Sequence, residues 1–400
     1  MKVLVFNCGS SSLTFKVFEK DIDNNIKIVF SGKAHRLLPT FDELPYIEYH
    51  YNEFSQNENF TVRSHAFAAE LVINKLKELG IEYNYIGHRW LHSSGQFNTV
   101  FIDDPLRIVL YSLIPLFPIH HPAILSVINK CRNLIPDIPQ YITVDNAFHS
   151  TIPFEAFTYT LPKELINKFG FRKFGFHGLS YQYVTKKIRD FFILPQERLK
   201  IIACHLGTGG SSVAAIKDGK SIDTSMGYTS LTGLVMSTRT GDIDPMLSVY
   251  LMGVYGYRPD DLMNLFNKKS GLLGVSEFSS DIRDIIKRIS EDSHSRLAFN
   301  MYIHRLKKYI GSYAVVLGGI DILVFTDDIG VHNWLVREKV CENMDWCGIK
   351  IDYKKNSEAI TDNISQINSE DSKVKILSIP TEEEYEIFYE GLKLIEGSPK

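Results

Sequence analysis

The sequence predicts an α/β protein of two domains with a duplicated plan. Its 400 residues exceed what one compact core usually holds and fit two domains of ordinary size. Short apolar runs typical of strands alternate with longer helical patterns. The strand-like runs are residues 3–6, 15–18, 201–204, 213–216 and 322–325, and the helical patterns are residues 66–79 and 296–317. The segment 354–373 is rich in Asn, Ser and charged residues, and we expect a surface loop there.

A weak internal repeat indicates the duplication. Residues 3–12 and 201–212 each begin with a strand-like run, continue through a polar residue and a Gly/Ser turn, and lead into a second strand. Such a hairpin can wrap an anion, because Gly/Ser turns let successive backbone amides point to one centre. Either turn alone is more often an ordinary hairpin, but the shared pattern favours two phosphate loops. Neither matches GxxxxGK[ST] or a GxGxxG that opens a helix, so a different phosphate-binding fold is implied.

Composition excludes several classes of protein. A hydrophobic content of 44% and a charged content of 23% are typical of a globular soluble protein, and no window is apolar enough to cross a bilayer. The net charge of −3, with basic residues spread along the chain, makes nucleic acid an unsuitable partner. Residues 1–6 predict a strand and not a signal peptide. Five cysteines without metal-ligand spacing predict free thiols and a cytoplasmic location.

Four clusters carry groups suited to phosphoryl transfer. This chemistry needs cations and hydrogen-bond donors around the moving group, and carboxylates for Mg²⁺. Arg89 and Arg239 lie in Gly-containing contexts, Asp145 ends a strand-like run, and His177 is bracketed by glycines. Taken singly, an arginine is usually a surface ion pair and a histidine is usually structural. Only the ordered combination points to a function.

Taken in their order along the chain, these clusters and the motifs around them resemble those of the acetate kinase family. This family is part of the superfamily of sugar kinases, actin and the heat-shock chaperone ATPases. The matching segments are residues 7–12, 87–89, 145–149, 175–178, 223–227, 238–245, 268–274 and 279–284, which span nearly the whole chain. The resemblance implies a duplicated actin-like (ribonuclease H-like) fold with the active site in the interdomain cleft, and a homodimer. It implies an N-terminal domain of residues 1–149 joined by a C-terminal helix, 385–400, and a second domain of residues 150–384.

The resemblance also implies roles for individual residues. Arg89 and Arg239 are expected to hold the phosphoryl and carboxyl groups of acetyl phosphate, His177 to donate to the developing charge, and Asp145 to orient the nucleophilic carboxylate or the metal. Mg²⁺ is expected at Asn7 and Glu383, with Glu382 and Glu384 as open alternatives. The residues on the phosphate or nucleotide side are Ser10, Ser11, Ser12, Thr14, His205, Leu206, Gly207, Thr208, Gly209, Asp281, Ile282, Arg283, Asp328, Ile329 and Gly330.

The resemblance implies an acyl pocket at Leu91, Ile119, Phe176 and Ser230, with His120 as a further substrate-binding residue. Family counterparts of Leu91 are often smaller, so its bulk favours acetate over longer acids. The alternative interpretation is that the apolar members are simply core residues, which is common. Nearby, His121 stands where the family has an asparagine, and Ser93-Ser94-Gly95 stands where Gly-Gly-Glu is usual.

The departures from the family concentrate in the nucleotide half of the site. The family's Phe-Thr-Ala-Gly-Ile-Gly-Glu-Asn is here residues 325–332, in which Asp327 and Asp328 replace an alanine and a glycine. The added bulk and negative charge disfavour ATP. Thr208 replaces an asparagine in a loop that carries one extra residue, and Thr14 replaces a lysine.

The loop around Thr208 and the Phe-Thr-Asp start resemble the amoebal, pyrophosphate-dependent branch of the family. The sequence therefore predicts the reaction acetyl phosphate + phosphate ⇌ acetate + pyrophosphate. One alternative is an ATP/ADP-dependent acetate or propionate kinase. A second is a nonenzymatic, actin-like or chaperone-like binding module, against which the retained Arg89, Asp145, His177 and Arg239 count.

Overall fold

The computed structural model describes residues 1–38, 43–92, 98–117, 120–192 and 199–397. The chain divides into an N-terminal unit of residues 1–147 and 382–400 and a C-terminal unit of residues 148–381. The boundaries predicted from the sequence, 149 and 385, lie a few residues from these. All five cysteines are free thiols. No helix in the described ranges has the length and apolar character needed to span a bilayer.

The N-terminal unit is built on an eight-stranded sheet of order β5-β4-β3-β2-β1-β6-β8-β7. Its strands are β1 (Lys2–Cys8), β2 (Leu13–Lys20), β3 (Ile26–His35), β4 (Tyr46–Tyr51), β5 (Phe54–Asn59), β6 (Tyr85–Trp90), β7 (Val100–Phe101) and β8 (Gln140–Val144). Strand β1 pairs antiparallel with β2 and parallel with β6, and β6 pairs parallel with β8. Residues 3–6 of β1 are fully buried, as expected of a central strand covered on both faces.

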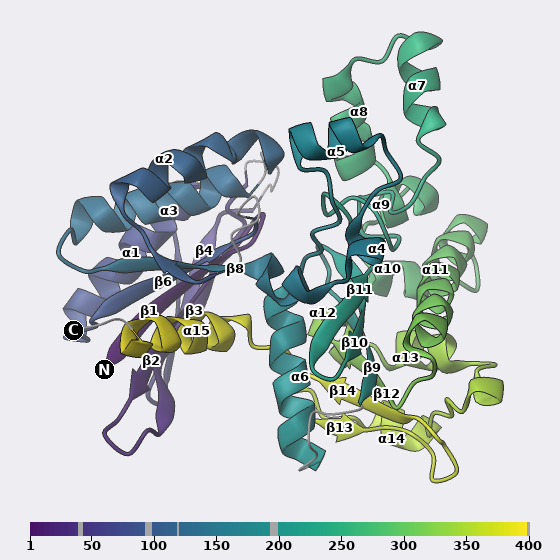
Figure 1. The fold of residues 1–400 in the computed structure, drawn as a ribbon. Coiled ribbons are helices and arrows are strands. Elements are labelled where there is room, and N and C mark those ends of the chain that lie inside the picture. Colours follow the sequence, from purple (N-terminus) through teal and green to yellow (C-terminus); the bar gives the residue numbers. More distant parts are fainter. Residues whose placement is uncertain (39–42, 93–97, 118–119, 193–198, 398–400) are drawn as a thin grey trace. The chain divides into compact units, whose positions relative to one another are not determined.

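Helices cover both faces of this sheet. They are α1 (His65–Glu78), α2 (Asp104–Ser112), α3 (His121–Leu134), the 3₁₀ turn η1 (Ile114–Leu116) and α15 (Glu383–Gly397). Figure 1 shows α1 and α3 on one side of the strands and α15 on the other. The hydroxyl of Tyr141 in β8 donates to the carbonyl of Ile387 at 3.1 Å, and a Cβ added at Gly391 would lie 2.1 Å from the Tyr141 ring. Because Gly391 lacks a side chain, α15 lies close against β8, which positions the glutamates of its first turn.

The C-terminal unit is built on a six-stranded sheet of order β11-β10-β9-β12-β14-β13. Its strands are β9 (Lys200–Leu206), β10 (Ser211–Lys217), β11 (Lys220–Thr224), β12 (Ile322–Thr326), β13 (Ser365–Gln366) and β14 (Lys375–Ile379). Its helices are α4 (Phe154–Phe157), α5 (Lys163–Phe169), α6 (Gly178–Phe192), α7 (Met246–Gly253), α8 (Pro259–Lys268), α9 (Gly271–Ser276), α10 (Ile282–Arg288), α11 (Ser293–Leu317), α12 (Asp327–His332), α13 (Trp334–Cys341) and α14 (Tyr353–Ser357), with 3₁₀ turns η2 (Asp145–Thr151) at the unit boundary and η3 (Asp345–Cys347).

The core of the C-terminal unit lies between the sheet and the long helix α11. Tyr302, Leu306 and Ile310 of α11 are buried in one cluster with residues of β9, β10 and β12. Helices α7 and α8 project beyond the rest of the unit (Figure 1).

The two sheets repeat one topology, which confirms the predicted duplication. In the N-terminal unit, β3-β2-β1 are antiparallel neighbours and β6 and β8 continue the sheet in parallel. In the C-terminal unit, β11-β10-β9 are antiparallel and β12 and β14 continue in parallel. The predicted strands and the two predicted helices are all present. One expectation was wrong: residues 354–373 are not only a loop, because α14 covers their start and β13 pairs with β14.

Candidate active site

The first predicted phosphate loop, residues 9–12, is the tight turn that joins β1 to β2; we call it the N-terminal loop. The amide of Gly9 donates to the carbonyl of Ser12 at 2.9 Å, and the amide of Leu37 donates to the carbonyl of Ser11 at 2.9 Å. Nε2 of His65 lies 3.0 Å from the carbonyl of Gly9. Burial lowers the pKa of His65, so the ring donates as a neutral imidazole. The half-buried side chains of Ser10, Ser11 and Ser12 are thus carried on a fixed backbone.

Asn7 lies near the end of β1, opposite Thr14 of β2, and joins the strand to the C-terminal helix. Its Nδ2 donates to Oε2 of Glu383 at 2.9 Å and to Oε1 of Glu384 at 2.8 Å. Its Oδ1 accepts from Nη1 of Arg89 at 3.3 Å. The amide is therefore fixed at both ends and holds two carboxylates beside it.

Arg89 lies in β6 and bridges two carboxylates. Its Nη1 donates to Oε2 of Glu383 at 2.8 Å, and its Nη2 lies 3.2 Å from Oδ1 of the fully buried Asp145. Burial alone lowers the pKa of Arg89, but the charges of Asp145 and Glu383 outweigh it and raise that pKa. The guanidinium is a fixed cation, and Asp145 orients it.

Lys16 belongs to this cluster, although it was not among the predicted site residues. It lies on β2 two residues after Thr14, so both side chains emerge on one face of the strand. Its Nζ lies 2.8 Å from Oε1 of Glu382 and 3.6 Å from Oε2 of Glu384. Lys16 therefore supplies a cation on the strand face where the family's lysine is replaced by Thr14. The sequence could have indicated Lys16, because a residue two positions after Thr14 lies on the same face of a strand.

The second predicted phosphate loop, residues 207–210, joins β9 to β10; we call it the C-terminal loop. The amide of Gly207 donates to the carbonyl of Gly210 at 3.1 Å, and the hydroxyl of Ser237 donates to the carbonyl of Thr208. Thr208 and Gly209 are exposed at the tip. It occupies the place in its sheet that the N-terminal loop occupies in the other.

His177 precedes α6 with a left-handed backbone (φ 60°) and points toward the C-terminal loop. Its Nδ1 lies 2.7 Å from the hydroxyl of Ser212, and its ring stacks on His205 with centroids 4.0 Å apart. His149 holds the preceding backbone, because its Nε2 lies 3.0 Å from the carbonyl of Phe176. A Cβ added at Gly210 would lie 3.6 Å from Nε2 of His177, so this nitrogen faces the loop.

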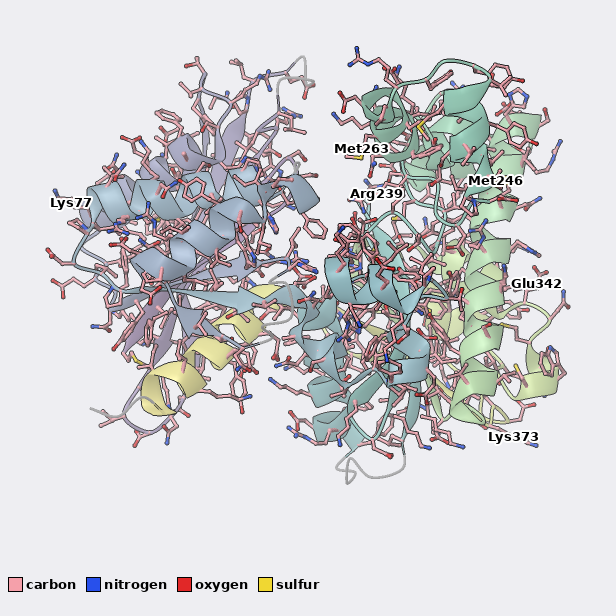
Figure 2. All side chains as sticks on the ribbon, turned by 45° about the horizontal axis from the view of Figure 1, so that its top comes forward. Lys77, Arg239, Met246, Met263, Glu342 and Lys373 are labelled. Carbon is pink, nitrogen blue, oxygen red and sulfur yellow. The ribbon has the colours of Figure 1, made fainter. Side chains whose placement is uncertain are left out.

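Arg239, labelled in Figure 2, brings a positive charge to the same loop. A Cβ at Gly210 would lie 3.2 Å from its Nη1, on the side where His177 also approaches. Nη1 donates to the carbonyl of Ser230 at 3.3 Å and lies 3.7 Å from the sulfur of Met236. Across the part of the chain that the structure describes, no carboxylate forms an ion pair with Arg239, and burial lowers its pKa. A desolvated cation without an acidic partner is suited to an anionic ligand.

The predicted nucleotide-side residues divide into two groups. Nη2 of Arg283 lies 2.6 Å from Oδ2 of Asp281, and its Nη1 lies 3.8 Å from Oδ2 of Asp328, so the arginine links α10 to α12. Leu206, Ile282 and Ile329 have side chains in the hydrophobic core. They and Gly330, which is also buried, can therefore reach a ligand only through the backbone.

Asp327 is the acidic residue that lies at the C-terminal loop, and the predicted set of site residues omitted it in favour of Asp328. Oδ2 of Asp327 lies 3.1 Å from Nε2 of His205, and a Cβ at Gly207 would lie 2.3 Å from that oxygen. Asp328 instead faces Arg283 and His332. The left-handed backbone of Asp327 (φ 65°) directs its side chain to the loop. Two adjacent aspartates in a sequence do not reveal which of them adopts this conformation.

Comparison with known proteins identifies the family. The acetokinase family matches residues 2–389. The chain belongs to this family. It is 40% identical to acetate kinase of Thermoanaerobacter pseudethanolicus over 99% of this chain and 100% of that protein. The crystal structure of acetate kinase from Entamoeba histolytica has a TM-score of 0.87 at 41% identity and covers 99% of this chain and 100% of that one. That of a propionate kinase from Francisella tularensis has a TM-score of 0.87 at 32% identity, with 97% and 98% covered.

These similarities confirm the duplicated actin-like fold class that the resemblance implied. The residues that the sequence predicted for substrate binding are each described within their own unit. Leu91 and His120 are in the N-terminal unit, where Leu91 is buried, and Phe176 and Ser230 are in the C-terminal unit, where Phe176 is buried. Ile119 and residues 93–95 lie outside the described residues.

The carboxylates beside Asn7 fit a magnesium ion. Mg²⁺ is usually held by one or two carboxylates, with waters and substrate phosphates completing its six ligands. Glu383 and Glu384 supply two carboxylates, each less than 10% exposed, and Asn7 lies beside both with its Oδ1 toward Arg89. Within the described ranges no group of three His, Cys, Asp or Glu side chains is arranged for a metal. A magnesium site with two protein carboxylates, completed by substrate phosphates and water, agrees with both the pair of glutamates and the lack of a third such ligand among the described residues.

Proposed function

We propose that this member of the acetokinase family catalyses Mg²⁺-dependent transfer of a phosphoryl group between acetyl phosphate and orthophosphate, which yields acetate and pyrophosphate. The observation that carries the proposal is the approach of Arg239 and His177 to the C-terminal loop. There a desolvated cation, which no carboxylate among the described residues pairs with, lies near an imidazole nitrogen. A phosphoryl group in transfer carries charge on its equatorial oxygens, and donors of this kind stabilise that charge.

In the proposed reaction an oxygen of orthophosphate attacks the phosphorus of acetyl phosphate, and the bond from phosphorus to the acyl oxygen breaks. Arg239 neutralises the transferring group and His177 donates a hydrogen bond to it. Arg89, held by Asp145 and Glu383, binds the anionic end of the acyl substrate. Asn7, Glu383 and Glu384 would hold Mg²⁺, which supplies positive charge next to the phosphate oxygens. Acetate leaves as the carboxylate.

The choice of orthophosphate over ADP rests on α12 and its neighbours. Two aspartates stand where the family has an alanine and a glycine, and one of them is joined to Arg283. A glycine that lets a nucleoside approach the backbone is thereby lost, and two negative charges are added beside the phosphate site. Both changes favour a small diphosphate over a nucleotide.

We also propose that the chain forms a homodimer through α7. Met246, Leu247, Val249 and Tyr250 of this helix are each about half exposed or more. Figure 1 shows α7 and α8 projecting from the unit, and Figure 2 labels Met246 of α7 and Met263 of α8. An apolar surface of this kind is typical of a protein–protein contact.

The deciding experiment is an assay of the purified protein with acetyl phosphate and Mg²⁺, run in parallel with orthophosphate and with ADP. Pyrophosphate formation without ATP formation is the expected result. ATP formation alone would leave an acetate kinase that uses nucleotides and would contradict the role given to α12. No consumption of acetyl phosphate with either partner would contradict the kinase proposal as a whole. His177→Ala is the matched inactive control, because it should abolish transfer while acetyl phosphate still binds.

A further inference from the structure

Asp327 has three properties that its neighbours in α12 do not share. It is the one residue of α12 with a positive φ, in a conformation that non-glycine residues adopt rarely. Its carboxylate touches the C-terminal loop at Gly207. It also reaches His205, at 3.1 Å. Uncommon backbone conformations that persist next to a ligand loop are often retained for function, and here the function follows from the contacts of His205.

His205 is buried, and each of its ring nitrogens has a partner. Nε2 faces Asp327, and Nδ1 lies 2.9 Å from the hydroxyl of Ser180. A carboxylate can only accept, so Nε2 of His205 must carry a proton. A serine hydroxyl can donate or accept, so Ser180 does not determine the tautomer. Asp327 is therefore the group that fixes the protonation of Nε2.

The orientation of His205 is transmitted to His177 by direct contact. The two imidazole rings lie 4.0 Å apart and within 22° of parallel. On its other side, His177 is held by Ser212, whose hydroxyl lies 2.5 Å from that of Tyr181. A rotation of the His205 ring would open this stack and move Nε2 of His177 away from Gly210. Side chains that orient a catalytic imidazole in this way affect turnover more than substrate binding.

We propose that Asp327 is a positioning residue for phosphoryl transfer, which fixes the tautomer and ring orientation of His205 and, through the stacked ring, aims His177 at the transferring group. This inference rests on the proposed transfer reaction. It adds a role that the family motif does not provide, because the family has an alanine at this position. It also gives Asp327 and Asp328 different tasks, since Asp328 faces Arg283 and not His205.

The test uses Asp327→Ala with Asp328→Ala as the matched control, because both remove a carboxylate from the first turn of α12. Two-bond proton–nitrogen correlation spectra of protein labelled with ¹⁵N in its 13 histidines report the tautomer of each ring. His205→Gln identifies the His205 signals. In the wild-type protein and in Asp328→Ala, we expect His205 to be protonated at Nε2. In Asp327→Ala, we expect its signals to shift toward a mixture of tautomers.

The kinetic readout separates positioning from binding. In Asp327→Ala, kcat should fall about tenfold or more, while KM for acetyl phosphate stays within about twofold of the wild-type value. Unchanged His205 signals in Asp327→Ala, or an unchanged kcat, would overturn the proposal. A rise in KM alone would assign Asp327 to binding and would also overturn it. If the wild-type protein turns over no acetyl phosphate, the kinase proposal fails, and the spectra still decide whether Asp327 controls His205.

Discussion

Nη1 of Arg89 lies 2.8 Å from Oε2 of Glu383, which ties the end of β6 to the first turn of α15. Asn7 donates to the same carboxylate oxygen at 2.9 Å. Glu383 is thus the glutamate of its triplet that contacts both the arginine and the asparagine. Glu384 contacts Asn7 and Lys16, and Glu382 contacts Lys16. This pattern ranks the three glutamates, which the sequence left open.

Glu383→Gln should weaken both metal use and catalysis. The amide keeps the size of the side chain but removes the charge that attracts Mg²⁺ and holds Arg89. We expect kcat to fall about 10- to 100-fold and the Mg²⁺ concentration for half-maximal activity to rise. Titration of Mg²⁺ in the transfer assay measures both. Glu382→Gln is the control, because Glu382 is the most exposed of the three glutamates and its carboxylate pairs with Lys16. An equal loss in both variants would contradict the ranking.

Lys16→Met should strengthen Mg²⁺ binding while it lowers stability. The ammonium of Lys16 lies 3.6 Å from Oε2 of Glu384, and its positive charge repels a magnesium ion bound at that carboxylate. Without Lys16 the glutamates repel one another, and we expect the free energy of unfolding in the absence of metal to fall by about 1–3 kcal/mol. The Mg²⁺ concentration for half-maximal activity should fall, because less positive charge competes for Glu384.

Lys20→Met is the matched control for Lys16. Lys20 lies on the same face of β2, and its ammonium pairs with Glu396 at the far end of α15. It should leave the Mg²⁺ requirement unchanged. A higher Mg²⁺ requirement in Lys16→Met would show that Lys16 supports the metal site and would contradict the competition described here.

The strands and the two hairpins could be predicted because their signal is local. Residues 3–6 and 201–204 are continuous apolar runs that end in Gly/Ser turns, and both form central strands. The contact of Asn7 with Glu383 could not be derived from local pattern, because 376 positions separate the two and adjacent glutamates look alike. The contact of Asp327 with Gly207 could not be predicted for another reason. The φ angle that turns this side chain toward the loop depends on tertiary packing and not on residue type.

Asp328→Gly should increase binding of ADP. The change restores the family's residue, removes one negative charge and releases Arg283 from a carboxylate that lies 3.8 Å away. Loss of one like charge near a phosphate at the protein surface is worth about 1 kcal/mol, so the Kd for Mg-ADP should fall about five- to tenfold in calorimetry. Asp284→Ala, which removes a half-exposed carboxylate paired with Lys287 in α10, should change the Kd less than Asp328→Gly does. An unchanged Kd in Asp328→Gly would remove the argument from this residue.

Tyr250→Asp should convert a dimer to a monomer. Tyr250 is 58% exposed in the middle of α7, among other exposed apolar residues. A charge placed there would have to be buried without a partner in the proposed contact, which is strongly unfavourable. Light scattering after gel filtration at micromolar concentration measures the mass. Val315→Asp is the control, since Val315 is 80% exposed on α11 and outside that surface. A wild-type monomer, or a dimer in Tyr250→Asp, would contradict the assignment of α7.

His121 should make the N-terminal unit sensitive to acid. The ring is fully buried and stacks on Trp90 with centroids 4.1 Å apart, and its Nδ1 lies 2.9 Å from the carbonyl of Leu113. Its Nε2 has no hydrogen-bond partner within the described ranges. Burial lowers the pKa of His121 to about 4 and outweighs the hydrogen bond, so the imidazole is neutral in the folded protein at pH 5.

The sign of the effect follows from the lowered pKa. Below about pH 6.5 the unfolded chain binds a proton at this position that the folded protein does not bind until about pH 4. Stability from the neutral ring is therefore complete above pH 6.5 and is lost as the pH falls toward 4. Between pH 7 and pH 5 the loss from His121 amounts to about 2 kcal/mol. His88, whose pKa burial also lowers to about 4, adds a loss of the same sign.

His121→Asn restores the residue that the family has and isolates the contribution of His121. The free energy of unfolding is measured in urea at pH 7 and pH 5 by tryptophan fluorescence, with Trp334 and Trp346 replaced by phenylalanine so that Trp90 is the reporter. We expect the difference between the two pH values to be smaller by about 2 kcal/mol in His121→Asn than in its parent. Both proteins keep a residual pH dependence of stability from His88. Equal differences in the two proteins would show that His121 exchanges its proton as readily in the folded state as in the unfolded one.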